Sequence, residues 1–78
     1  MEKLDKYGNS QMLFEIAYED FCFEWSCNHA TDDYAPEIEI TGDPEISENG
    51  EWCIDCEFPD GDRATLYMNR DGNIYVEA

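Results

Sequence analysis

The sequence contains very few basic residues. Four lysines and arginines stand against twenty aspartates and glutamates in 78 residues, so the formal net charge is −16. Nucleic acids and anionic membranes are themselves polyanions, and we expect a chain this acidic to bind neither of them directly. The charge instead favours basic partners or cations. Its self-repulsion also opposes the compact state.

Long apolar runs are also missing. A membrane-spanning helix needs about 18 or more consecutive apolar residues, and the sequence has no such run. The N-terminal residues MEKLDK lack the apolar centre of a secretory signal peptide. We therefore expect a cytoplasmic protein with reduced thiols. A chain of 78 residues predicts one domain, 1–78, near the lower size limit for folding alone.

Residues with catalytic potential are scarce. The sequence has one histidine, His29, in the polar stretch 28–35. A Cys–His nucleophile pair would need an oxyanion site and an orienting partner, and we recognise neither motif. Neither Asp60–Asp62 nor Asn69–Asn73 matches a calcium-binding loop, and both are typical of turns. We predict no enzyme and no cofactor.

The clearest pattern is in residues 51–77, which predict three antiparallel strands. They are joined by two turns that end in Asp60-Gly61 and Asp71-Gly72. Three-residue hairpin loops, with each glycine at positive φ, give a register that collects the apolar residues on one face. That face holds Trp52, Ile54, Cys56, Ala64, Leu66, Met68, Ile74 and Val76. A two-residue loop at Asp71-Gly72 would instead place Met68 and Ile74 on opposite faces.

Two further stretches extend this sheet. Residues 37–41 alternate as a strand, and Gly42-Asp43-Pro44 interrupts it at an edge or a bulge. The turn Glu48-Asn49-Gly50 sets Ile46 opposite Trp52, which enlarges the apolar face.

Residues 12–27 are compatible with two structures. A helix would group Met12, Leu13, Ile16, Ala17 and Phe21, with Asn9 or Ser10 as its cap, but it would spread Phe14, Tyr18, Phe23 and Trp25 around the rest of the wheel. A strand would alternate twice, with a phase slip at Glu19-Asp20 that one β-bulge absorbs. The aromatic content favours the strand. We therefore predict an all-β fold. It is an antiparallel meander of about five strands, a curled sheet or small barrel with a long bent first strand. The alternative is an α+β fold with a helix near residues 10–24 packed on a four-stranded sheet.

The four cysteines resemble two halves of a zinc site in their spacing. They are Cys22, Cys27, Cys53 and Cys56. Zinc needs both thiolates of a pair pointing at one ion, whereas strand parity puts Cys53 and Cys56 on opposite faces. We predict that Cys27 and Cys56 are core residues and that Cys22 and Cys53 point outward. A zinc site is not our preferred interpretation.

The strongest functional signal is the predicted acidic surface. Its candidate partner-binding residues are Glu15, Glu24, Asp32, Asp33, Glu37, Glu39, Glu51, Asp55, Glu57, Tyr67, Tyr75 and Glu77. Carboxylates two apart on a strand are about 6.6–6.8 Å apart. Phosphates along a nucleic-acid strand present charge at a similar interval. Tyrosines on the same face would add rigid contact area.

In its profile, which is tiny, acidic, reduced and mainly β, the chain resembles phage-encoded inhibitors that mimic DNA, such as some anti-CRISPR proteins. The resemblance is one of composition and transfers no site. It implies a viral, non-enzymatic inhibitor that blocks the basic nucleic-acid-binding surface of a partner protein, for example in a CRISPR–Cas defence system. The alternatives are an immunity or antitoxin-like protein for a basic nuclease toxin, and a small zinc-stabilised module.

Overall fold

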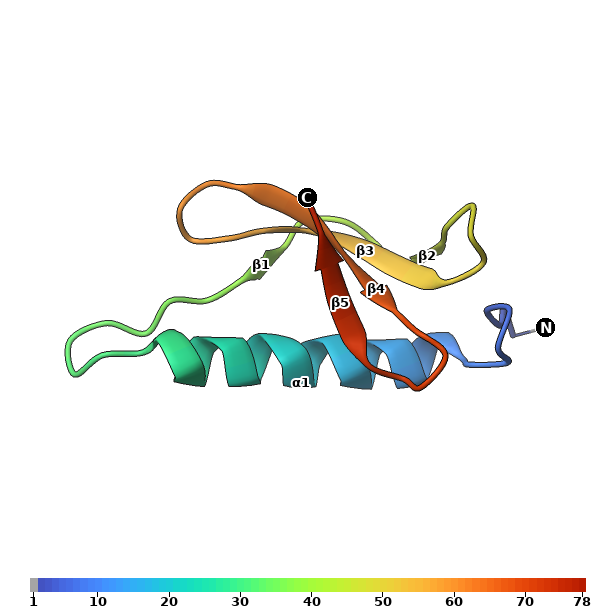
Figure 1. Cartoon of the computed structure of the whole chain (residues 1–78), viewed down its shortest axis with the longest axis horizontal. Helices are drawn as coiled ribbons and strands as arrows, with labels where there is room; N and C mark the ends of the chain where they lie inside the picture. The colour runs from blue at the N-terminus through green and yellow to red at the C-terminus, as the bar shows by residue number, and fades with distance from the viewer. Residues whose placement is uncertain (1) are drawn as a thin grey trace.

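The computed structural model describes residues 2–78, so Met1 of the N-terminal segment lies outside the described residues. One helix precedes five strands: α1 (Gln11–His29), β1 (Glu39–Ile40), β2 (Glu45–Ile46), β3 (Trp52–Glu57), β4 (Arg63–Met68) and β5 (Ile74–Glu77). Figure 1 shows α1 running along one side of the antiparallel sheet, in a molecule of 45 × 19 × 19 Å. The fold is α+β, and the all-β prediction is wrong. Among residues 2–78, no helix is both long enough and apolar enough to cross a membrane.

The predicted bent strand over residues 12–27 is in fact most of helix α1. Ser10 caps the helix by accepting the N–H of Leu13 at 3.3 Å. The stripe that packs on the sheet has helical spacing and consists of Phe14, Ala17, Tyr18, Phe21, Cys22 and Trp25. The α+β alternative named a helix here, although α1 continues to His29, beyond the predicted end near residue 24.

The strand prediction failed because the outward side of α1 is apolar as well. Met12, Leu13, Ile16 and Phe23 are 67%, 53%, 58% and 68% exposed. Because apolar residues lie on both the inward and the outward side of α1, they show no clear helical period in the sequence. The aromatic residues then satisfied a strand pattern equally well.

The predicted register of the sheet is confirmed. Ile54 lies opposite Leu66, and Met68 lies opposite Ile74. The N–H of Phe58 donates to the carbonyl of Asp62 at 2.8 Å, and that of Asn69 donates to Asn73 at 2.9 Å. Both hairpins therefore have three-residue loops. The glycines that close the three turns, Gly50, Gly61 and Gly72, have φ values of 85°, 92° and 81°.

The edge of the sheet beside β3 is formed by two short strands. Ile40 of β1 pairs with Cys56, and Ile46 of β2 pairs with Trp52. Gly42-Asp43-Pro44 separates the two strands, which confirms the predicted interruption at an edge. The sheet accordingly has five strands, in place of the four of the α+β alternative.

Trp52 is the centre of the core. It is 1% exposed, and its ring stacks on Phe14 at 5.9 Å between centroids. Its indole N–H donates to the carbonyl of Asn9 at 2.8 Å, which ties the N-terminal segment to the core. That segment is a closed turn in which buried Asp5 accepts the N–H groups of Tyr7 and Asn9 at 2.8 and 2.9 Å.

The apolar face of the sheet is covered unevenly by α1. Leu66 and Met68 are fully buried, whereas Val76 is 39% exposed. Val76 lies near the C-terminal end of β5, which points away from α1 in Figure 1. The coverage of the apolar sheet face by α1 thus decreases along β5 towards the C-terminus of the chain.

Candidate functional site

The side of the sheet away from α1, here called the outer sheet face, displays carboxylates from four strands and tyrosines from two. The register sets Glu39 opposite Glu57 and sets Thr65 between Asp55 and Glu77. By the same pairing, the outer sheet face consists of Glu39, Glu45, Cys53, Asp55, Glu57, Arg63, Thr65, Tyr67, Tyr75 and Glu77. Adjacent strands are about 4.8 Å apart, and alternate residues on one strand are about 6.6–6.8 Å apart. Neighbouring carboxylates on the outer sheet face are therefore spaced several ångströms apart.

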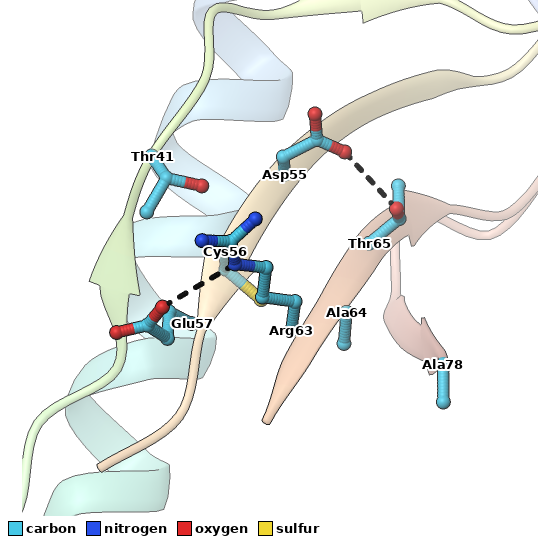
Figure 2. Close-up of a pocket in the computed structure, with 8 residues that line it drawn as sticks. All are labelled: Thr41, Asp55, Cys56, Glu57, Arg63, Ala64, Thr65 and Ala78. Atoms are coloured by element: carbon cyan, nitrogen blue, oxygen red, sulfur yellow. Dashed lines mark hydrogen bonds and ion pairs between the residues drawn. The ribbon is translucent and has the colours of Figure 1, made fainter. Parts of the chain in front are cut away.

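Two polar contacts join β3 to β4 on this face. Arg63 Nε lies 3.6 Å from Glu57 Oε1, and the Thr65 hydroxyl donates to Asp55 Oδ1 at 3.1 Å (Figure 2). Glu57 and Arg63 thus form a cross-strand ion pair. The Arg63 side chain is 88% exposed, so the pair contributes no more than about 1 kcal/mol. These four residues border an open hollow of about 510 Å³ whose carboxylates suit a basic side chain.

Tyr67 and Tyr75 form a rigid aromatic pair on the outer sheet face. Their rings stack at 5.4 Å between centroids. The hydroxyl of Tyr75 donates to Glu51 Oε1, and this bond, followed by burial, raises the pKa of Tyr75 to about 12. Burial, then the neighbouring charges of Cys53 and Glu77, raises the pKa of Tyr67. Both phenols are therefore neutral at physiological pH, and the O–H of Tyr75 is already donated to Glu51.

Glu51 is a structural carboxylate. It is 6% exposed and accepts hydrogen bonds from Tyr75 and from the side-chain amide of Asn49, the latter at 3.1 Å. Glu51 is one of the predicted partner-binding residues. Its burial removes it from the displayed surface, and its role is to hold the β2–β3 turn against β5.

The remaining predicted acidic residues lie elsewhere on the molecule. Glu15 and Glu24 are on α1, because the segment assigned to a strand is helical. Asp32 and Asp33 are exposed in the loop after α1, and Glu37 lines a hollow beside the C-terminal half of the helix. The predicted set is therefore divided between the outer sheet face and the helical side.

The cysteines do not come together. Cys53 is half-buried on the outer sheet face and Cys56 is 1% exposed on the inner one, so the predicted opposite placement of this pair is confirmed. The prediction for the other pair is wrong, because the helix turns Cys22 towards the core and leaves Cys27 exposed. Burial, then the nearby Cys56, raises the pKa of Cys22 to about 11. Within the described part of the chain, no three His, Cys, Asp or Glu side chains gather where a metal ion could be held.

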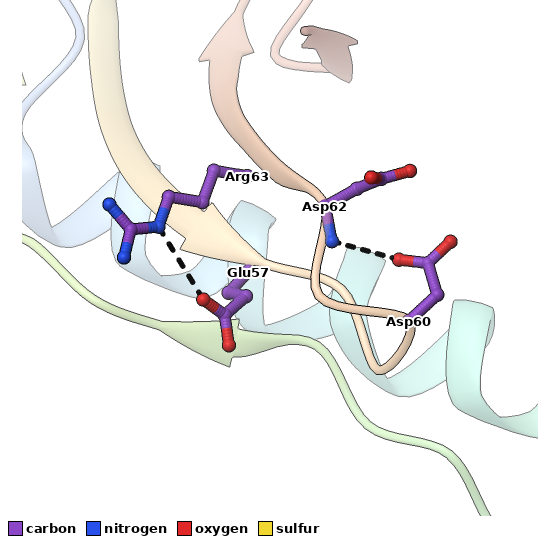
Figure 3. A network of polar contacts seen from close by, with 4 residues as sticks. All are labelled: Glu57, Asp60, Asp62 and Arg63. Carbon is purple, nitrogen blue, oxygen red and sulfur yellow. Dashed lines mark hydrogen bonds and ion pairs between the residues drawn. The ribbon is translucent and has the colours of Figure 1, made fainter.

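One polar side chain in each of the two Asp-Gly turns bonds to the backbone of its own turn. Asp60 Oδ1 accepts the N–H of Asp62 at 3.0 Å, beside the Glu57–Arg63 pair (Figure 3). Asn69 Oδ1 accepts the N–H groups of Asp71 and Asn73, each at 3.0 Å. These are Asx turns, in which a short polar side chain bonds to the backbone two residues on.

Glu45 and an aromatic cluster are not among the residues predicted from the sequence. Glu45 lies on the outer sheet face opposite Cys53, and its parity with Ile46 could have placed it there. Trp25, Tyr34 and Phe58 line one pocket at the end of α1. Trp25 lies on α1, Tyr34 in the loop that follows and Phe58 at the β3–β4 turn, so no local sequence pattern predicts the pocket.

Comparison of the chain with protein-family models, curated proteins and solved structures finds no match in any of the three. The function is therefore inferred from the residues of this chain.

Proposed function

We propose that this protein is a non-enzymatic inhibitor that occupies the basic nucleic-acid-binding surface of another protein. Its carboxylates take the places of phosphates. The observation that carries the proposal is the outer sheet face, where Glu39, Asp55, Glu57 and Glu77 are held in register beside a stacked tyrosine pair. The composition resembles that of phage-encoded DNA mimics, so a nuclease of a defence system such as CRISPR–Cas is the kind of partner that we propose.

The physical basis is charge presented on a preformed scaffold. A β-sheet holds its side chains without the entropy cost of ordering a loop, so less free energy is lost on binding. Of the four basic residues, only Arg63 is in a strand, and it is paired with Glu57. A negative face of this kind steers a positive partner and accelerates association, and salt screens the effect.

The experiment is competition with nucleic acid. The protein is used to capture its partner from the native host. Binding to the purified partner is then measured with increasing duplex DNA and with increasing salt. We expect DNA to displace the protein and the affinity to fall as salt rises. Binding that persists unchanged in saturating DNA would refute mimicry.

Matched variants locate the interaction surface. Glu39→Gln with Glu77→Gln removes two charges from the outer sheet face, and Glu19→Gln with Asp20→Asn removes two exposed charges from α1. We expect the sheet variant to slow association roughly tenfold at low salt and the helix variant to have a much smaller effect. Equal effects would show that total charge, and not the outer sheet face, directs binding.

A further inference from the structure

A second site lies at the C-terminal end of α1. Here the helix, the loop that follows it and the β3–β4 turn surround an open pocket of about 400 Å³. Four of its lining residues carry rings with π faces, namely Trp25, His29, Tyr34 and Phe58. This size falls within the range of ordinary ligand pockets. We call it the aromatic pocket.

The rings of the aromatic pocket are held in place before any ligand binds. Trp25 stacks on His29 at 4.2 Å between centroids and meets Phe58 edge-to-face at 5.5 Å. His29 Nδ1 is also 2.8 Å from the carbonyl of Trp25. Tyr34 is set by a turn in which Thr31 N–H donates to the Tyr34 carbonyl at 2.7 Å. Even so, Tyr34 is 59% exposed, which leaves its ring free for a ligand.

The electrostatics of the aromatic pocket favour a cation. Aromatic faces carry negative quadrupole charge and attract cations within about 6 Å of the ring centre. The C-terminus of a helix carries roughly half a negative charge, and α1 ends at His29 beside the pocket. Asp60 lines the pocket, and Asp32 and Asp33 immediately precede Tyr34 in the chain. Rings, helix end and carboxylates thus all favour a positive ligand.

We propose that the aromatic pocket binds the guanidinium group of an arginine side chain presented by the partner. A guanidinium is planar and weakly hydrated, stacks on aromatic faces and pairs with carboxylates, whereas a lysine ammonium is strongly hydrated. Proteins that bind nucleic acid use arginine widely for phosphate contacts. The source of the arginine rests on the proposed function, but the chemistry of the aromatic pocket does not.

The test uses the free amino acid derivative and the two tryptophans of the chain. N-acetyl-arginine amide is titrated into the protein while the indole N–H signals are followed by NMR. Trp25 lines the aromatic pocket and Trp52 is 1% exposed in the core. We expect a saturable shift of the Trp25 signal and an unmoved Trp52 signal, which also reports that the fold is intact. N-acetyl-citrulline amide, which has the same shape without the charge, should not saturate the site.

Two aspartates of one turn provide matched variants. Asp60 lines the aromatic pocket, whereas Asp62, two residues away and also exposed, does not. Asp60→Asn should weaken N-acetyl-arginine amide binding roughly two- to fivefold, as should Tyr34→Ala, and Asp62→Asn should leave it unchanged. Equal weakening by the two aspartate variants, or equal binding of the citrulline derivative, would overturn the proposal. Tighter binding of N-acetyl-lysine amide would overturn the choice of guanidinium.

The two proposals can fail separately. If the arginine derivative binds but no partner is displaced by DNA, the aromatic pocket stands and the proposed function falls. If DNA displaces a partner whose affinity is unchanged by Tyr34→Ala, and the arginine derivative does not bind, the function stands and the aromatic pocket proposal falls.

Discussion

Replacing Phe14 by alanine tests the packing of α1 on the sheet most directly. Phe14 is 0% exposed, stacks on Trp52 and meets the ring of Tyr18 at 5.1 Å. Removing a buried phenylalanine typically costs about 3–5 kcal/mol, partly through the cavity left behind. At about 0.05–0.15 kcal/mol per residue, a chain of 78 residues has about 4–12 kcal/mol in total. We therefore expect Phe14→Ala to remove much or all of the stability.

The matched control is Phe23→Ala in the same helix. Phe23 is 68% exposed, so we expect its loss to change stability by only about 0.5 kcal/mol. Phe14→Leu keeps most of the volume and should lose about 1–2 kcal/mol, which remains measurable if the alanine variant unfolds. Urea unfolding followed by far-UV circular dichroism gives all three values. A bent strand would put both phenylalanines on one inner face, so equal losses for the two alanine variants would refute the helical packing.

Three further expectations concern titration, turns and thiols. The unfolded state releases the Tyr75 proton at about pH 10, the ordinary tyrosine pKa, whereas the folded state keeps it up to a pKa of about 12. The folded protein therefore loses stability as the pH rises between these values. Tyr75→Phe should lessen this loss. Thermal melts across that interval show this, and parallel curves for the two proteins would contradict it. Gly61→Ala should lower stability by about 1 kcal/mol because of its positive φ. Gly50→Ala should lower it further, since an added Cβ would also lie 2.9 Å from the Lys6 side chain. Equal urea midpoints for the two variants would disprove this contact. Iodoacetamide at pH 8 should modify exposed Cys27 before Cys22, whose pKa is raised to about 11, and mass spectrometry showing the reverse order would count against the burial of Cys22.

The two candidate sites differ in how far they can be predicted from the sequence. The outer sheet face could be listed from strand parity, and Glu39, Asp55, Glu57 and Glu77 do lie on it. Strand alternation does not show that the Glu51 carboxylate is buried and accepts the hydroxyl of Tyr75. The aromatic pocket was not predictable at all, because its rings come from a helix, a loop and a turn that meet only in the folded chain.

The register of the sheet follows from local sequence alone. Asp-Gly and Asn-Gly turns act over four or five residues, and a slip by one residue would expose the apolar side chains of a strand, so local chemistry and alternation agree on one pairing. The secondary structure of residues 12–27, by contrast, depends on tertiary packing, and so does the choice of acidic residues that share a surface. That segment is apolar on both sides, and one face of the sheet needed a cover. Packing of the stripe centred on Phe14 and Tyr18 against Trp52 made it a helix.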